Sequence, residues 1–276
     1  MDDSEAPSGE RQYHLEVADG EMPSPVLLPG NPERVEKITA LWDDVNELAH
    51  HREYRTAAGR YDDTTLAVTS TGIGSPSAAI AVEELARVGV DTVIRVGSCG
   101  VLKSDIDIGD LVITTAAVRQ EGTSDEYVRE DYPAAADDRV VGALIAAAEA
   151  LDYPYHTGVT LSTDSFYAGQ ARPGYGGYRA PGSDALLESM QEANVINVEM
   201  EASAICTLGQ LYGLRAGAVC TAYANRETGE FGVTGERRAA EVASKAASIL
   251  AGMDRRVAET DADRWYPGLG CKLRPP

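Results

Sequence analysis

The chain has 276 residues, 43% of them hydrophobic, which is enough to bury the core of one large α/β domain or two small ones. Its 24 basic and 44 acidic residues give a formal net charge of −20, which argues against a broad surface for nucleic acid or anionic lipid. No apolar run approaches the ~20 residues of a membrane span, and the polar start MDDSEAPSGERQ is unlike a secretory signal. We therefore expect a cytoplasmic protein that binds neither nucleic acid nor membranes.

Lysine is scarce in this sequence although Asp and Glu are abundant. The lysines are Lys37, Lys103, Lys245 and Lys272. This imbalance is typical of proteins that work in concentrated salt, because molar salt shortens the screening length to ~3 Å and weakens repulsion among surface charges. The composition therefore predicts a halophilic source.

The cysteines and histidines are scattered along the chain, without the spacing of a zinc site or of a disulfide framework. This pattern predicts reduced thiols at Cys99, Cys206, Cys220 and Cys271. It points to no metal that the protein would require.

Short apolar runs alternate with longer amphipathic runs. The short runs predict strands at 24–28, 65–70, 92–96, 111–115, 158–161, 195–198 and 216–222. The amphipathic runs predict helices at 32–42, 76–88, 140–151, 184–193, 200–212 and 237–257, the first capped by Asn31 and opened by Pro32. Such alternation indicates a central, largely parallel sheet covered by helices on both faces. No linker interrupts it, so we expect one domain over 14–258, with 1–13 and 259–276 peripheral.

Polar or glycine-rich segments follow five of the predicted strands. They lie at 29–31, 71–74, 97–100 (a Gly-Ser-Cys-Gly turn), 166–172 and 199–201. In α/β folds of this kind, ligands bind beyond the carboxyl ends of the strands. The five segments therefore predict where a ligand binds.

The heptad FYAGQAR at 166–172 combines an aromatic pair with an amide and a guanidinium two residues apart. Gln170 offers an acceptor and donors, whereas Arg172 offers donors only, so together they match a planar edge that alternates C=O and N–H, as uracil does. Phe166 or Tyr167 would cover the ring face. The alternative is a surface loop in which both polar side chains are solvated.

Guanidinium groups, turn amides and a hydroxyl near the other strand ends indicate an anion site. The candidates are Arg34, Arg52, Arg95, Gly30, Gly97, Gly100 and Ser98. Neither GxxxxGK[ST] nor GxGxxG is present, so a small free anion fits better than a nucleoside triphosphate or NAD. Alternatively, each arginine, including Arg95 at the end of an apolar strand, forms an ion pair with a carboxylate.

Two carboxylates, Glu199 and Glu201, flank Met200 where a predicted strand meets a helix. A carboxylate at that point, and Glu201 above all, would accept hydrogen bonds from the vicinal hydroxyls of a sugar. The alternative is that both residues simply stabilise the N-terminus of the following helix.

A resemblance to a known family rests on PGNPERVEKI, HREY, STGIGSPSAAIAVEEL, RVGSCG, SFYAGQAR, VEMEAS and ANR, in that order. Through these motifs, residues 14–248 resemble the nucleoside phosphorylase family, and within it the uridine phosphorylases of the bacterial hexameric type. The resemblance implies a three-layer α/β/α sandwich with a mixed, partly barrel-like central sheet. It also implies a pentosyltransferase that converts uridine and inorganic phosphate, its co-substrate, to uracil and ribose 1-phosphate. The implied enzyme needs no cofactor and works as a homo-oligomer, at least a dimer and by resemblance a hexamer.

The resemblance also assigns roles to individual residues. The implied phosphate ligands are Gly30, Arg34, Arg95 and Ser98, joined by Arg52 from a neighbouring subunit. The implied ribose contacts are Met200, Glu201 and, from the neighbouring subunit, His14. The implied base contacts are Phe166, Gln170, Arg172, Arg226 and Tyr223. Glu53, Ile73 and Ser77 match positions that hold a potassium ion between subunits in some relatives. We expect Arg95, Glu201 and Arg226 to be catalytic.

Three departures from the family pattern bear on these roles. Asn31 stands where the family has Asp, which should leave the anion site more positive, and Ser98-Cys99 replaces a Thr-Thr pair but keeps one hydroxyl. Tyr223 replaces a smaller aliphatic residue beside the base and leaves a purine phosphorylase, acting on guanosine or inosine, open. The segment 223–226 lacks the Asp with which the purine branch protonates N7, which favours a pyrimidine. A hydrolytic nucleosidase and a non-catalytic nucleoside-binding protein are further alternatives.

Overall fold

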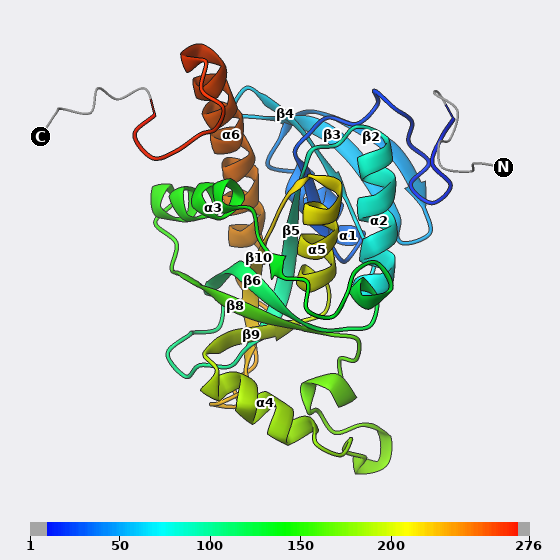
Figure 1. Cartoon of the computed structure of the whole chain (residues 1–276), viewed down its shortest axis with the longest axis vertical. Coiled ribbons are helices and arrows are strands. Elements are labelled where there is room, and N and C mark those ends of the chain that lie inside the picture. The colour runs from blue at the N-terminus through cyan, green and yellow to red at the C-terminus, as the bar shows by residue number, and fades with distance from the viewer. Residues whose placement is uncertain (1–9, 270–276) are drawn as a thin grey trace, which may run out of the picture.

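The computed structural model describes residues 10–269 (Figure 1). Its strands are β1 (Val26–Pro29), β2 (Asp43–His51), β3 (Tyr54–Tyr61), β4 (Thr64–Thr69), β5 (Thr92–Val101), β6 (Leu111–Gln120), β7 (Ala134–Ala135), β8 (Tyr155–Thr163), β9 (Val195–Glu199) and β10 (Arg215–Asn225). Its α-helices are α1 (Glu33–Thr39), α2 (Ser75–Arg87), α3 (Asp138–Ala150), α4 (Ser183–Glu192), α5 (Ala202–Tyr212) and α6 (Glu236–Thr260). The predicted thiol of Cys271 and the outer parts of both predicted peripheral segments lie outside the described residues.

One mixed sheet organises the fold. Its strands follow the order β10-β6-β8-β9-β5-β1-β4-β3-β2, and β10 pairs in addition with β5. This extra pairing closes β5, β10, β6, β8 and β9 into a barrel, from which β1, β4, β3 and β2 extend. The expected mixed, partly barrel-like sheet is therefore confirmed. The prediction of a largely parallel sheet was wrong, because antiparallel pairs such as β10–β6 and β3–β4 are as numerous as the parallel ones.

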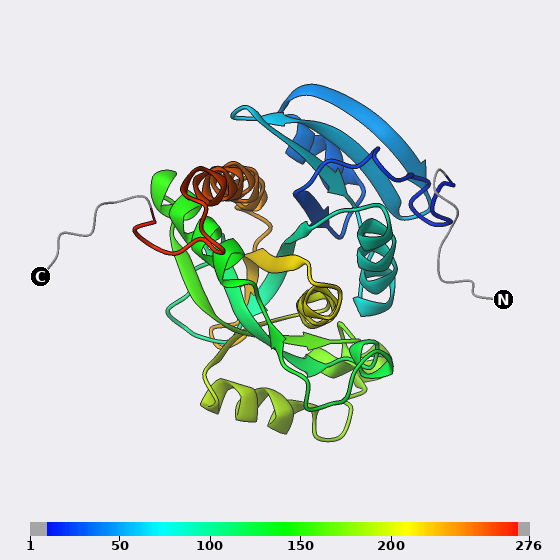
Figure 2. The ribbon, with the colours of Figure 1, turned by 45° about the horizontal axis from the view of Figure 1, so that its top comes forward.

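Helices cover both faces of the sheet, as predicted. In Figures 1 and 2, α3 and α6 lie side by side on one side of the barrel, and α2 and α5 lie on the other. Alternate residues of one strand serve the two faces: Val93 packs with α2 and α5, whereas Ile94 packs with α3 and α6. The described part of the tail also adds to this hydrophobic core, since the partly buried Trp265 packs against the cluster of α3 and α6.

Every strand and helix expected from the sequence is present, with ends shifted by a few residues. The edge hairpin of β2 and β3 was missed, because β2 is polar and mostly exposed and lacks an apolar run. Its two-residue turn carries no Gly or Asn signal, although Arg52 adopts a left-handed φ of 55°. The predicted turn at 97–100 was also wrong, since β5 continues through it to Val101 while pairing with β10.

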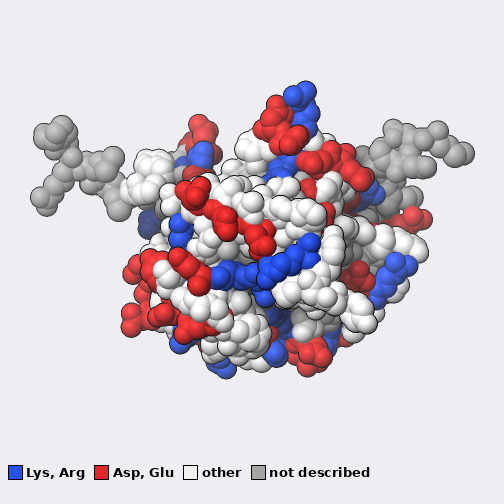
Figure 3. All heavy atoms as spheres, turned by 90° about the horizontal axis from the view of Figure 1, so that it is seen from below, with Lys and Arg blue, Asp and Glu red and all other residues white. Residues whose placement is uncertain are grey.

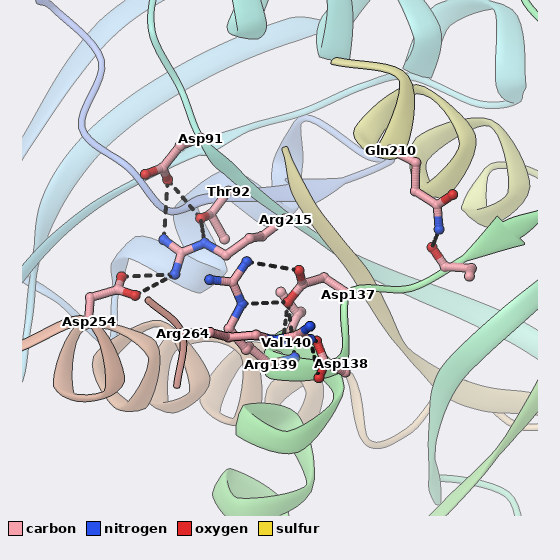
Figure 4. A network of polar contacts seen from close by, with 11 residues as sticks. Asp91, Thr92, Asp137, Asp138, Arg139, Val140, Gln210, Arg215, Asp254 and Arg264 are labelled. Carbon is pink, nitrogen blue, oxygen red and sulfur yellow. Dashed lines mark hydrogen bonds and ion pairs between the residues drawn. The ribbon is translucent and has the colours of Figure 1, made fainter. Parts of the chain in front are cut away.

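An ion-pair network fastens the amino ends of β5 and β10 to α6 (Figure 4). The guanidinium of Arg215 donates to Thr92 Oγ1 at 2.7 Å and to both carboxylate oxygens of Asp254 at 2.8 Å. In the same view, the carboxylate of Asp137 accepts from the backbone N–H of Arg139 at 3.0 Å and so caps α3. The two strands are thus tied at one end, and their carboxyl ends remain available for a site.

Acidic side chains dominate the surface, as the composition requires. On the face shown in Figure 3 they lie in patches on either side of a band of basic side chains. Within residues 10–269, no helix has both the length and the apolar character needed to cross a membrane. The thiols of Cys99, Cys206 and Cys220 are buried and free.

Candidate active site

A cavity of about 380 Å³ opens at the carboxyl ends of the strands. All five segments that were predicted to surround a ligand contribute to its lining. They supply Gly30, Asn31, Gly72, Ile73, Gly97, Ser98, Cys99, Gly100, Phe166, Gln170, Arg172, Glu199, Met200 and Glu201. Arg34, Arg95 and Tyr223 line the same cavity. The tertiary structure therefore brings most of the predicted site residues to one place.

Arg95 is the buried charge at the centre of the cavity wall, with 4% of its surface exposed. Its Nε lies 2.8 Å from Glu199 Oε2, and its Nη2 lies 2.5 Å from Glu201 Oε2. Burial alone would lower the pKa of Arg95, but the charges of Glu201 and Glu199 outweigh it and raise that pKa. The ion-pair alternative considered for this arginine is thus present, and the same residue also lines the cavity.

Gly97 leaves the space that the Arg95 guanidinium occupies. A Cβ at this position would lie 2.8 Å from Arg95 Nη2 and 2.7 Å from Cys220 Sγ, both closer than real Cβ contacts allow. This close approach, and not a turn, explains why the strand carries glycine here.

The two neighbouring carboxylates have different partners. Glu199 accepts from the backbone N–H groups of Glu201 at 2.8 Å and Ala202 at 3.0 Å, so it satisfies the N-terminus of α5. The carboxylate of Glu201 instead accepts from the backbone N–H of Gly74 at 2.6 Å and pairs with Arg95. The helix-stabilising alternative therefore describes Glu199, whereas Glu201 links two strand-end segments across the cavity.

Burial and two neighbouring charges act on the pKa of Glu201. Burial raises the pKa of Glu201, and the charge of Glu199 adds to that shift, while Arg95 opposes it. The Arg95 charge favours the ionised form of Glu201, in which both carboxylate oxygens act only as acceptors.

The predicted base-reading loop folds into the opposite wall. Gln170 is buried, and Arg172 stacks on the ring of Phe166 with its guanidinium carbon 4.3 Å from the ring centroid. The buried Nε of Arg172 has no hydrogen-bond partner among the described residues. Burial lowers the pKa of Arg172, and nearby Arg226 lowers it further. Burial of Gln170 argues against the alternative of a solvated loop at that residue, whereas Arg172 is only partly buried.

Arg226 stands behind this wall and does not itself line the cavity. Its Nη2 donates to the backbone carbonyl of Gln170 at 3.0 Å, so it supports the loop that carries the amide.

Tyr223 reaches the cavity because of a bulge in β10. Its neighbours Ala222 and Ala224 pair with the consecutive residues Cys99 and Gly100 of β5, so Tyr223 is the extra residue. Such a bulge redirects a side chain, and here the ring lies beside Arg34. Its hydroxyl lies 3.4 Å from Arg34 Nη2.

His14 and Arg52 lie outside the cavity of their own chain. The Nδ1 of His14 lies 2.7 Å from Glu84 Oε1. The guanidinium carbon of Arg52 lies 5.7 Å from the ring centroid of Tyr13, next to His14. The two residues thus form a separate cluster on one surface.

The three residues matched to a potassium site surround Gly72. A Cβ there would lie 2.8 Å from Glu53 Cγ and 3.2 Å from Ser77 Oγ. The Ser77 hydroxyl in turn donates to the backbone carbonyl of Ile73 at 3.3 Å. The Ser77 hydroxyl and the Ile73 carbonyl therefore lie close together beside Gly72, next to the side chain of Glu53. Within residues 10–269, no group of three or more His, Cys, Asp or Glu side chains could hold a metal ion.

Sequence reasoning missed Phe231 and Glu236. Phe231 lines the cavity from the segment between β10 and α6, where it bridges to Ala224. Glu236 opens α6 and binds Arg34 from behind. An isolated aromatic in a glycine-rich segment and an acidic residue at a helix start are common surface features, so neither carried a signal.

The fold and this cavity define a class of protein. A sequence model described as the phosphorylase superfamily matches residues 26–257, and the chain belongs to that superfamily. It is 54% identical to the uridine phosphorylase of Thermococcus kodakarensis over 258 residues, which cover 94% of this chain and 93% of the relative. It is 42% identical to the guanosine phosphorylase of Halorubrum lacusprofundi, with 79% of this chain and 86% of the relative covered.

A solved structure agrees with these relatives. The crystal structure of uridine phosphorylase from Vibrio fischeri superposes with a TM-score of 0.79 at 34% identity. The match covers 88% of this chain and 100% of that one.

Replacing Gly97 with Ala should weaken phosphate binding by about tenfold or more, because the new Cβ would push the Arg95 guanidinium from its two carboxylates. Titration calorimetry with inorganic phosphate measures this. Gly142→Ala, where no atom lies within 4 Å of the new Cβ, is the matched control and should bind normally. Unchanged phosphate affinity in Gly97→Ala would contradict the role given to this close approach.

Proposed function

We propose that the protein is a uridine phosphorylase, which converts uridine and inorganic phosphate to uracil and ribose 1-phosphate. The observation that carries the proposal is that one cavity is lined by Arg34, by the buried Arg95–Glu201 pair and by Gln170 and Arg172. A nucleoside and a phosphate ion need such groups together, for the anion, the sugar and the base.

Phosphate would bind on the side of Gly30, Arg34, Arg95 and Ser98. Guanidinium groups bind its oxygens in a fixed geometry and hold it below C1′ of the sugar as the attacking nucleophile. As the bond to the base breaks, positive charge grows on the ribose, and the nearby phosphate stabilises it.

Glu201 and Met200 would hold the ribose. The carboxylate of Glu201 is fixed by Arg95 and by the backbone N–H of Gly74, so its remaining acceptor positions can take the two vicinal hydroxyls. Because the same arginine touches this carboxylate and the phosphate region, sugar and nucleophile are positioned together.

Uracil would leave as an anion against Gln170 and Arg172. The unpartnered buried Nε of Arg172 supports a ligand acceptor at this wall. Phe166 would cover the base, and Arg226 would act by holding the Gln170 backbone. Exchange of the base for phosphate involves no redox step, so the proposed reaction needs no cofactor.

Base release separates this function from its rivals. We expect uracil to appear from uridine only when phosphate is present, and Arg95→Ala to lower kcat/KM by about a thousandfold or more, because it also leaves two buried carboxylates unpaired. Chromatography of the free bases measures both. Release without phosphate would indicate a hydrolase, and no release under any condition would indicate a nucleoside-binding protein.

A guanosine phosphorylase is the second candidate function. It is favoured by the 42% identity to the Halorubrum lacusprofundi enzyme and by the bulky Tyr223 in the cavity. The same assay with guanosine, inosine and thymidine decides between them, since a purine enzyme would release guanine faster than uracil.

We further propose a homo-oligomer, a hexamer built from dimers, in which His14 and Arg52 complete the site of a neighbouring subunit. Their position outside their own cavity supports this arrangement. The oxygens near Gly72, from Glu53, Ile73 and Ser77, would hold a potassium ion at the same interface. The free buried thiols support a cytoplasmic location, where thiols stay reduced.

Mixing two inactive variants tests the shared site. Arg52→Ala and Arg95→Ala subunits should each be nearly inactive alone, but a mixed dimer carries both substitutions in one site and none in the other. With random mixing, co-expression should therefore restore about a quarter of wild-type activity per subunit. Recovery of no activity in a mixture shown to contain mixed dimers would contradict shared sites.

We also propose that the protein is halophilic, on the strength of its net charge of −20. Its thermal midpoint should rise with KCl up to molar concentrations, because salt screens repulsion among the carboxylates. Differential scanning calorimetry measures this, with sucrose at equal osmolality as the control for solute exclusion. A thermal midpoint in dilute buffer as high as that in molar KCl would contradict the proposal.

A further inference from the structure

Arg34 lies between two cavities. It lines the 380 Å³ cavity described above and a second one of about 290 Å³, enclosed by α1, β5 and the start of α6. An arginine side chain with open space on both sides can adopt several rotamers, and only some of them present its guanidinium to the first cavity. The direction of the Arg34 guanidinium therefore depends on the side chains that contact it.

Two side chains contact the guanidinium of Arg34 from opposite ends. Glu236, at the start of α6, accepts a hydrogen bond from Arg34 Nε at 2.6 Å, on the side of the second cavity. Tyr223, on the side of the first cavity, accepts from Nη2 at 3.4 Å through its hydroxyl. A guanidinium has five N–H donors, so three remain for an anion.

Arg34, Lys37 and Glu236 together carry a net positive charge. Glu236 Oε2 lies 2.7 Å from Nζ of Lys37, so one carboxylate is shared by two cations and the three residues carry a net charge of +1. Burial would raise the pKa of Glu236, but the hydrogen bond from Lys37 and the charge of Arg34 outweigh it and lower that pKa. Near neutral pH, Glu236 is therefore ionised and fixes Arg34 without cancelling the local positive charge.

The Tyr223 hydroxyl can donate a hydrogen bond into the cavity. Burial raises the pKa of its hydroxyl, so the group stays protonated near neutral pH. Because it accepts from Arg34, its own hydrogen remains free to donate.

We infer that Glu236 and Tyr223 are positioning residues that hold Arg34 toward the bound phosphate and so set the affinity for phosphate. The inference rests on the proposed phosphorolysis. It gives Tyr223 a task on the anion side of the cavity in addition to any contact with the base. It also gives α6, which supplies Glu236, a part in substrate binding.

Steady-state kinetics on the intact oligomer tests this inference. KM for phosphate is measured at saturating uridine, and KM for uridine at saturating phosphate. Glu236→Ala should raise KM for phosphate about tenfold, and Glu236→Gln, which keeps an acceptor but loses the charge, about threefold. Tyr223→Phe, which removes only the hydroxyl, should also raise it about threefold. KM for uridine should stay within about twofold in all three variants.

The matched control is Asp62→Asn. It removes a carboxylate that lies 2.7 Å from Nζ of Lys245 on the same helix, α6, but lines neither cavity. Both KM values should match the wild type.

Three results would overturn the inference: an unchanged KM for phosphate in Glu236→Gln and Tyr223→Phe, an equal rise in both KM values, or the same rise in Asp62→Asn. If Glu236→Ala does not fold, the two conservative variants decide. The proposed function fails separately, because a wild-type protein that releases no uracil with phosphate would refute phosphorolysis itself.

Discussion

The site depends on one buried guanidinium held between two carboxylates. Burying Arg95 without partners would be costly, and leaving Glu199 or Glu201 unpaired would be equally so. The pairing therefore fixes the relative positions of β5, the end of β9 and the start of α5. Through the backbone N–H of Gly74 it also fixes the segment before α2. Each of these elements carries part of the cavity, so the ion pairs that stabilise the fold also position the chemistry.

Closure of the barrel makes this arrangement possible. Pairing of β10 with β5 places Tyr223 and Arg226 beside segments more than a hundred residues earlier in the chain. The bulge at Tyr223 then turns an aromatic hydroxyl toward Arg34. At the other end of the same strands, Arg215 ties their starts to α6 (Figure 4). The strands are therefore held to α6 at their starts, and the segments beyond their other ends line the cavity.

An anionic protein must concentrate its positive charge where an anion is to bind. Within residues 10–269, ion pairs such as Arg129–Asp131 and Arg264–Asp138 are exposed and contribute little to stability. Around the cavity the pairs are shared instead. One carboxylate serves both Arg34 and Lys37, which leaves a positive excess next to Gly30 and Ser98. This sharing leaves the group of Arg34, Lys37 and Glu236 with a net positive charge beside the cavity, which supports the proposed phosphate site.

The sequence by itself determined the alternation of strands and helices, the segments that surround the cavity and the family, because periodicity and motifs are written in neighbouring residues. It did not reveal the hairpin of β2 and β3, whose polar edge strand buries too little to leave a pattern. Nor did it decide that Glu199 accepts from the start of α5 while Glu201 accepts from Gly74, or that Glu236 reaches Arg34. Those roles arise from contacts between residues far apart in the chain or from the exact direction of a side chain, and only the tertiary structure sets them.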